Sequence, residues 1–254
     1  MSSFIKYEVS DHIARIWIDR PDALNAMNSQ LIRDLDATLD LVAADDRIRV
    51  LVIGGTKHFA AGADIKEMVN CDPKGAAEFC FTPTFNKVMN LKIPTIAAIG
   101  GYALGGGTEL SMCCDMRIIS ENGIMGQPEI NIGIMPGGGG CVRLPRIVGY
   151  SKAFEIITTG WNIPAAEALK IGLVNKVVPD DALLEEALKL AARIASRPLS
   201  AVVAAKATMK RSLEMDSVED ATLYERDRWA ELFVTKDQKE GMNAFIEKRK
   251  PSFN

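Results

Sequence analysis

The chain has 254 residues, of which 48% are hydrophobic and 25% are charged, and its formal net charge is −3. This composition is that of a globular protein with enough apolar material for a core, and the length allows one large domain or one domain with an appendage. The near-neutral balance gives no electrostatic basis for binding nucleic acid, and no block of like charge indicates binding to an anionic membrane surface.

Three features bear on where the protein resides. The first twenty residues carry charges throughout and lack the apolar region of a signal peptide. The longest apolar run, IPTIAAIGGYALGGG, is too short and too rich in glycine to span a membrane. The five cysteines form neither a CxxC pair nor a disulfide framework, which favours reduced thiols. We therefore expect a soluble, cytoplasmic protein.

The first two thirds of the chain alternate between strand and helix patterns. Residues 4–18 alternate loosely and predict a strand or a hairpin. Residues 28–46 carry apolar side chains at helical spacing behind a cap at Asn28 or Ser29, and predict a helix. Four β-branched runs predict further strands, at 48–55, 94–101, 115–120 and 175–178. Apolar strands separated by helical patterns are typical of an α/β fold with parallel strands and helical crossovers.

The last third of the chain changes character. Residues 181–196 read as a clean amphipathic helix, and three further helical segments follow without a strand signal. We place a soft boundary near Arg197-Pro198. The prediction is an α/β core over residues 1–197 and a helical region over residues 198–254 that packs on a neighbouring subunit.

The stretch GYALGGGTEL, residues 101–110, places three glycines beside an acid in an apolar segment. It is not a dinucleotide fingerprint, because Leu110 stands where GxGxxG needs its last glycine, and Val142 does so in the later run. The chain contains no Gly-Lys pair for a phosphate loop and no GxSxG elbow. Its two histidines, His12 and His58, are too few for a histidine-rich metal site.

Glycine permits a main chain to approach a ligand closely, and a glycine turn that opens a helix presents free N–H groups. Residues 108–115 predict a short helix after such a turn, so two N–H donors aimed at one oxygen could form an oxyanion hole. Further glycine turns lie at 58–68 and 133–140. Three turns at strand ends or helix starts favour a ligand held by backbone groups in a crevice. The alternative is that the glycines only permit close packing of helix and strand.

Two acids lie beside these turns in apolar surroundings. Glu109 follows the glycine run, and Glu129 lies in MGQPEINIGIMP. An acid in an apolar environment has a raised pKa and suits proton transfer near neutral pH, and two across a cleft could divide the roles of acid and base. The alternative is that each caps a helix or pairs with an arginine such as Arg117 or Arg143.

The chain resembles the crotonase, or enoyl-CoA hydratase, superfamily over nearly its whole length. The resemblance lies in six segments in the family's order: RPDALNAMN (20–28), FAAGADIKEM (59–68), IPTIAAIGGYALGGGTELSMCCD (93–115), GQPEINIGIMPGGGG (126–140), ALKIGLVNKVV (168–178) and KDQKEGMNAFIEKRKPSF (236–253). Glutamate stands in both catalytic stretches, as it does in the hydratase-like subset.

This resemblance implies a fold of ββα turns in a spiral with a helical C-terminal trimerisation part, assembled as a trimer or a dimer of trimers. It implies an enoyl-CoA hydratase, a lyase of fatty acid metabolism, that acts on an acyl-CoA thioester and needs neither a metal nor a separate cofactor.

The resemblance also implies roles for individual residues. The N–H groups of Ala63 and Gly106 would polarise the thioester carbonyl. Glu109 would activate water, and Glu129 would give a proton to the α-carbon. The substrate channel would be lined by Ala63, Asp64, Ile65 and Lys66, together with Gly106.

Three positions depart from the common pattern of the superfamily: Gly100, the pair Cys141-Val142, and Trp161. The last two bear on the preference for an acyl chain. The alternatives left open are a hydratase, hydrolase or isomerase of the same superfamily that acts on a cyclic or dienoyl-CoA, and a CoA-thioester binding protein without turnover. An NAD-dependent oxidoreductase is disfavoured by the failed glycine fingerprint.

Overall fold

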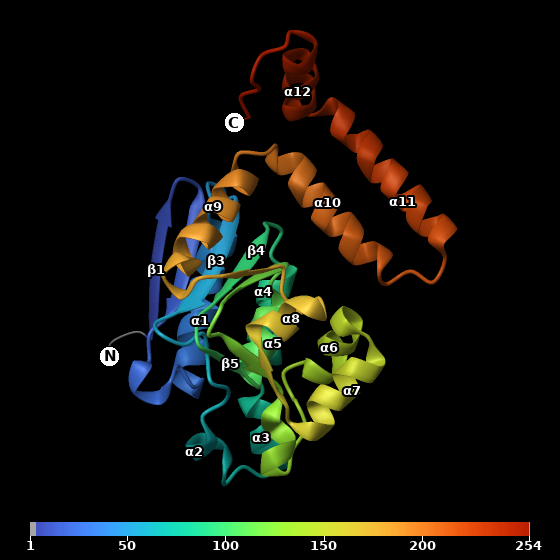
Figure 1. Ribbon diagram of the computed structural model, residues 1–254. Helices are drawn as coiled ribbons and strands as arrows, with labels where there is room; N and C mark the ends of the chain where they lie inside the picture. The colour runs from blue at the N-terminus through green and yellow to red at the C-terminus, as the bar shows by residue number, and fades with distance from the viewer. Residues whose placement is uncertain (1–3, 254) are drawn as a thin grey trace.

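The computed structural model describes residues 4–253. Its centre is a six-stranded sheet in the order β1-β2-β3-β4-β6-β9, beside a small sheet in the order β5-β7-β8 (Figure 1). The strands of the large sheet are β1 (Ile5–Ser10), β2 (Ile13–Ile18), β3 (Val50–Gly55), β4 (Thr95–Ile99), β6 (Met116–Ser120) and β9 (Lys176–Val178). Those of the small sheet are β5 (Tyr102–Leu104), β7 (Ile124–Gly126) and β8 (Asn162–Pro164).

The large sheet is antiparallel only at its first pair. β1 and β2 form a hairpin, and every later pair is parallel, with Ile16 opposite Ile53 where β2 meets β3. The predicted hairpin and the four predicted strands are confirmed. β3 and β4 lie with helices on both sides, which is why they read as continuous β-branched runs rather than as alternating ones.

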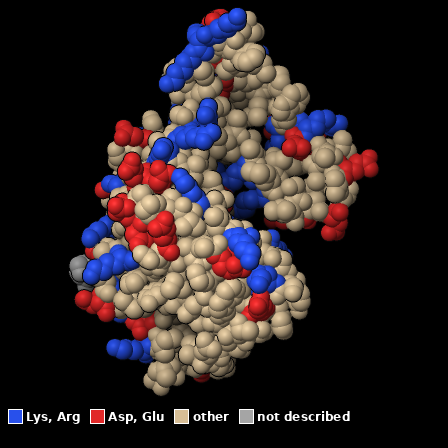
Figure 2. All heavy atoms as spheres, viewed as in Figure 1, with Lys and Arg blue, Asp and Glu red and all other residues tan. Residues whose placement is uncertain are grey.

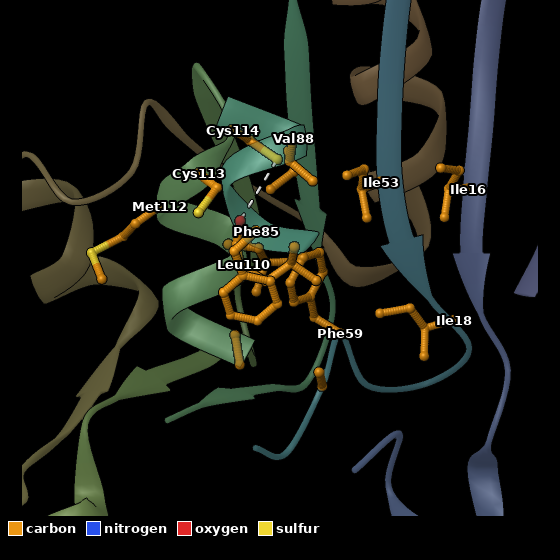
Figure 3. Close-up of a cluster of buried hydrophobic side chains, with 14 of the residues drawn as sticks. Ile16, Ile18, Ile53, Phe59, Phe85, Val88, Leu110, Met112, Cys113 and Cys114 are labelled. Atoms are coloured by element: carbon orange, nitrogen blue, oxygen red, sulfur yellow. Dashed lines mark hydrogen bonds between the residues drawn. The ribbon is translucent and has the colours of Figure 1, made fainter. Parts of the chain in front are cut away.

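Helices cover both faces of this sheet. On one face lie α1 (Ser29–Ala44), α4 (Thr82–Asn90) and α5 (Gly106–Cys113), and on the other lies α9 (Leu183–Ala195). Figure 3 shows Ile16, Ile18 and Ile53 of the sheet facing Phe85, Val88 and Leu110 of the helices. Of the two predicted caps of α1, the structure has Asn28 in that role, because its side chain accepts a hydrogen bond from the N–H of Leu31.

The remaining helices of the first 200 residues are short and surround the small sheet. They are α2 (Ile65–Met68), α3 (Pro73–Phe79), α6 (Gly140–Val148), α7 (Tyr150–Thr159) and α8 (Ala165–Lys170), with single 3₁₀ turns η1 (Pro21–Ala23), η2 (Pro128–Ile132) and η3 (Asp180–Ala182). Within residues 4–253, no helix has the length and apolar character needed to cross a bilayer.

The chain ends in three helices that extend away from the sheets (Figure 1). They are α10 (Leu199–Ser212), α11 (Val218–Glu231) and α12 (Lys236–Ile246), with the turn η4 (Leu232–Val234) between the last two. Lys206 of α10 fastens them to the core, because its Nζ donates to the Ile93 carbonyl at 2.8 Å and to the Asp115 carboxylate at 2.7 Å. The boundary at 197/198 stays a prediction.

Candidate active site

A mostly apolar cavity of about 550 Å³ is lined by α2, the C-terminal part of α3, the first turn of α5, the turn η2 and the glycine turn before α6. All three predicted glycine turns contribute to its wall, through Gly62, through Gly105 and Gly106, and through Gly137 and Gly138. Both predicted acids, Glu109 and Glu129, lie in the same wall. The apolar part of the wall includes Ile65, Met68, Phe79, Phe81, Ile132, Ile134 and Met135.

Two backbone segments run side by side at this wall and present N–H groups to it. Ala60 pairs with Ala103 in a parallel bridge, and Ala63 pairs likewise with Met27. The N–H of Met27 donates to the Gly62 carbonyl, and the N–H of Asp64 donates to the Met27 carbonyl. Because successive groups of an extended chain alternate in direction, the N–H of Ala63 points away from Met27. Gly106 is the first residue of α5, where N–H groups have no partner within the helix. Ala63 and Gly106 lie in the wall of the same cavity, and their action as a pair of donors to one oxygen stays a prediction.

The glycines of residues 105–107 have different uses. A Cβ on Gly107 would lie 2.0 Å from the Ala60 carbonyl oxygen, so this glycine permits the close approach of α5 to its neighbour. Gly105 has a φ of +51°, which suits the sharp turn into the helix. The helix begins two residues before the predicted start at Thr108. The packing interpretation therefore applies at Gly107, and the backbone-donor interpretation stays a prediction for Gly106.

Glu109 lies in the first turn of α5, with only 3% of its surface exposed. Its Oε1 accepts from the N–H of Gly140 at 2.7 Å, and the N–H of Gly138 also donates to the carboxylate. Burial raises the pKa of Glu109, while these two donors and the positive charge of Arg143 oppose that rise. The result is a buried carboxylate held in one orientation by the third glycine turn.

Glu129 lies in η2 and is half-buried. Burial, with a smaller contribution from the negative charge of the nearby Glu109, raises the pKa of Glu129 to about 7. Gln127 is fully buried beside it, and with its Nε2 turned toward Glu129 it donates to both carboxylate oxygens, at 2.9 and 3.0 Å. In the part of the chain that the structure describes, neither glutamate forms an ion pair, so the predicted alternative of pairing with Arg117 or Arg143 does not occur.

The residues predicted to line the channel divide into two groups. Ala63, Ile65 and Gly106 lie in the cavity wall. Asp64 instead caps α2 by accepting from the N–H of Lys66, and its carboxylate pairs with Arg20 at 2.7 Å. Lys66 is exposed at the start of α2. Contacts of Asp64 and Lys66 with a substrate stay a prediction.

Sequence reasoning missed two residues that support the site and gave a third another role. Gln127 contacts Glu129, and Phe81 lies so close to Gly106 that an added Cβ there would be 3.2 Å from its ring. Arg143, named from the sequence only as a possible ion-pair partner of an acid, instead supports the glycine turn beside Glu109. For Gln127 the signal was its position, an amide two residues before an acid in an apolar stretch. Among residues 4–253 no group of three or more His, Cys, Asp or Glu side chains is arranged to hold a metal ion.

The fold is shared with solved structures. The protein superposes on the crystal structure of an enoyl-CoA hydratase from Bacillus anthracis with a TM-score of 0.95, at 36% sequence identity and over 99% of both chains. This likeness confirms the predicted crotonase-like α/β fold with its helical C-terminal part.

The sequence comparisons are consistent with that fold. The chain is 47% identical over 247 residues to a "Probable enoyl-CoA hydratase" of Rhizobium meliloti, covering 97% of this chain and 96% of the relative. It is 43% identical over 250 residues to a "Crotonyl-CoA hydratase" of Syntrophomonas wolfei, with coverage of 97% and 96%. The family model for enoyl-CoA hydratase/isomerase matches residues 8–254. The chain belongs to this family.

Proposed function

We propose that this protein is an enoyl-CoA hydratase, which adds water to the double bond of a 2-enoyl-CoA thioester to give a 3-hydroxyacyl-CoA. One observation carries the proposal: two carboxyl groups with different environments share an apolar cavity with two free backbone N–H groups. Hydration of a conjugated thioester needs a base for water, an acid for the α-carbon and donors for the carbonyl oxygen.

The environments of the two glutamates favour a division of roles. Glu109 receives two N–H donors and the field of Arg143, which favour its ionised form. It therefore takes a proton from water as the oxygen bonds to the β-carbon. Glu129, with a pKa raised to about 7, carries a proton near neutral pH and delivers it to the α-carbon. The two proton transfers balance, because Glu109 gains one proton and Glu129 loses one. The starting protonation states of both glutamates return when protons redistribute after product release.

The N–H groups of Ala63 and Gly106 donate hydrogen bonds to the thioester oxygen, which bears the developing negative charge. As water adds, electron density moves to the thioester oxygen and an enolate forms. Donors fixed in the backbone of α5 and of the 60–63 segment stabilise that oxygen without reorganisation, at about 3–4 kcal/mol for each donor. The reaction transfers no electrons, and CoA enters as part of the substrate, so the proposal includes no separate cofactor.

The relatives' names favour hydration over the alternatives, since one is called a crotonyl-CoA hydratase and another a short-chain-enoyl-CoA hydratase. Isomerisation of a double bond can proceed with one acid, whereas both acids are present here. A non-catalytic thioester-binding protein would have no need for two glutamates with raised pKa values in its binding cavity.

The test follows the enoyl-thioester absorbance of crotonyl-CoA. We expect rapid loss of absorbance with the wild type and a fall in kcat of about 10²–10⁴-fold for Glu109→Gln and for Glu129→Gln. Glu121→Gln, at an exposed glutamate beyond β6, is the matched control and keeps the wild-type rate. If the wild type binds CoA esters but does not hydrate crotonyl-CoA, the substrate is a cyclic or dienoyl-CoA. If CoA esters do not bind, the functional proposal is wrong.

The proposal includes a homo-oligomer, either a trimer or a dimer of trimers. The C-terminal helices expose large apolar side chains, with Leu213, Val218, Val234 and Phe245 each at least 80% exposed. Figure 2 shows side chains of both signs of charge on the C-terminal helices as well as on the core, so charge does not set these helices apart on this face. An exposed apolar surface of this kind marks a protein interface.

The oligomer is tested by sedimentation of the wild type and of Phe245→Asp. We expect the wild type to sediment as a trimer or larger, and the variant, which places a charge in the proposed interface, to dissociate. A monomeric wild type would refute this part of the proposal. A cytoplasmic location is also proposed, supported by five cysteines that are all free.

A further inference from the structure

Arg143 of α6 joins the third glycine turn to a helix on the other side of the site. Its Nη1 donates to the carbonyl of Gly138 at 2.7 Å, and its Nη2 donates to Oδ1 of Asn86 on α4 at 3.0 Å. The planar guanidinium therefore spans from α4 to the turn. A lysine has the same charge but only one nitrogen, and cannot hold both partners in this fixed geometry.

The glycine turn is folded directly over this guanidinium. Gly139 has a φ of +108°, and a Cβ there would lie 1.9 Å from Nη1 of Arg143. The neighbouring residues of the turn, Gly138 and Gly140, give their N–H groups to Glu109. One continuous set of contacts therefore runs from Asn86 through Arg143 and the turn to the carboxylate.

The charges around Glu109 show why a cation matters there. The titratable groups that face it are Glu129 from η2, Cys141 from α6 and Cys113 from its own helix. Each is neutral or negative, so none favours the ionised form of a carboxyl that is almost fully buried. Arg143 supplies a positive charge that favours the ionised form of Glu109.

We propose that Arg143 is a positioning residue that braces the glycine turn against Glu109 and keeps this carboxylate ionised as the base. Arg143 is not among the residues that line the cavity, so it acts through the turn and through its positive charge. The proposal rests on the proposed function, in which Glu109 activates water. It also explains how two glutamates in one apolar cavity serve as base and acid, because Glu129 has no comparable cation among its interactions.

The test separates the charge of Arg143 from its geometry. Arg143→Met removes both, and Arg143→Lys keeps the charge but not the two-point brace. Arg146→Met is the matched control, since Arg146 lies on the same helix, is exposed, and donates only to the Val142 carbonyl one turn earlier. The readout is kcat/KM for crotonyl-CoA as a function of pH, with KM and kcat measured separately.

The expected shift follows from the role of Glu109 as a base. Only its ionised form takes a proton, so kcat/KM falls as the pH drops through its apparent pKa. Removing the neighbouring positive charge raises this pKa, and we expect the acid limb of Arg143→Met to lie at higher pH than that of the wild type. On that limb the rate of Arg143→Met then falls further below the wild-type rate than it does at higher pH. Arg143→Lys loses kcat at all pH values with a smaller shift, and Arg146→Met follows the wild-type profile.

An acid limb at the same pH in Arg143→Met, Arg143→Lys and the wild type overturns the proposal, even if the rates fall. If Arg143→Met does not fold, Asn86→Leu removes the outer anchor and keeps the charge. It is expected to lower kcat as Arg143→Lys does, and wild-type kinetics in both variants would also overturn the proposal.

A second measurement does not depend on turnover. The Glu109 carboxyl is titrated by ¹³C NMR in protein labelled at glutamate Cδ and is assigned with Glu109→Gln. A pKa that is higher than in the wild type in Arg143→Met, or in Arg143→Gln if the first variant is unfolded, supports the inference even if crotonyl-CoA is not a substrate. An unchanged pKa refutes it, so its failure is distinguishable from failure of the proposed function.

Discussion

Replacing Gly138 by alanine tests whether the third glycine turn positions the base. A Cβ at this residue would lie 2.5 Å from Oε2 of Glu109 and 3.2 Å from Cε2 of Phe85. Ordinary van der Waals contact begins at 3.4 Å, so the carboxylate must move by about 0.9 Å, because the aromatic ring blocks the other direction. Displacement of a catalytic group by about 1 Å can cost about 10²-fold in rate, and we expect a loss of that size in kcat for Gly138→Ala.

The assay is the hydration of crotonyl-CoA, with Gly137→Ala as the control. A Cβ on Gly137 meets no atom within 4 Å, and neither glycine has a positive φ, so the pair differs in steric contact with Glu109 rather than in backbone strain. We expect a far smaller effect in the control, and little change in KM for Gly138→Ala, since the N–H donors to the thioester remain in place. A kcat for Gly138→Ala equal to that of Gly137→Ala would refute the positional role of the turn.

Three further predictions concern pH and stability. Because Glu129 acts as the acid and has a pKa raised to about 7, kcat/KM is expected to fall as the pH rises above that value, which a pH–rate profile measures. The same raised pKa means that ionisation of Glu129 costs stability in the folded state. The Tm is therefore expected to decline as the pH rises from the ordinary value of 4.5 to about 7, and Glu129→Gln should remove that part of the decline in calorimetry. Lys206→Met removes the cationic partner of Asp115, which keeps its hydrogen bonds from Thr95, and is expected to lower the free energy of unfolding by about 2 kcal/mol in urea titration. Lys189→Met, at an exposed pair, is expected to change it by less than about 0.5 kcal/mol.

Much of the architecture could be predicted from local pattern. The hairpin at residues 4–18, the α1 helix behind its Asn28 cap and the four β-branched runs all occur where the sequence placed them. Such elements depend on periodicity and capping, which neighbouring residues encode. The start of α5 was placed at Thr108 rather than at Gly106, because glycine is a poor helix former in isolation. Close packing of Gly107 on the Ala60 carbonyl overrides that preference.

By itself the sequence determined that Glu109 and Glu129 lie beside glycine turns in apolar stretches, and its resemblance to the superfamily supplied their roles. Only the tertiary structure decided which groups surround each acid. The donors to Glu109 come from Gly138 and Gly140, about thirty residues further along the chain, and the balancing charge comes from Arg143. The pKa of a buried carboxyl depends on burial and on contacts within a few ångströms, and those contacts join segments that the linear sequence keeps far apart.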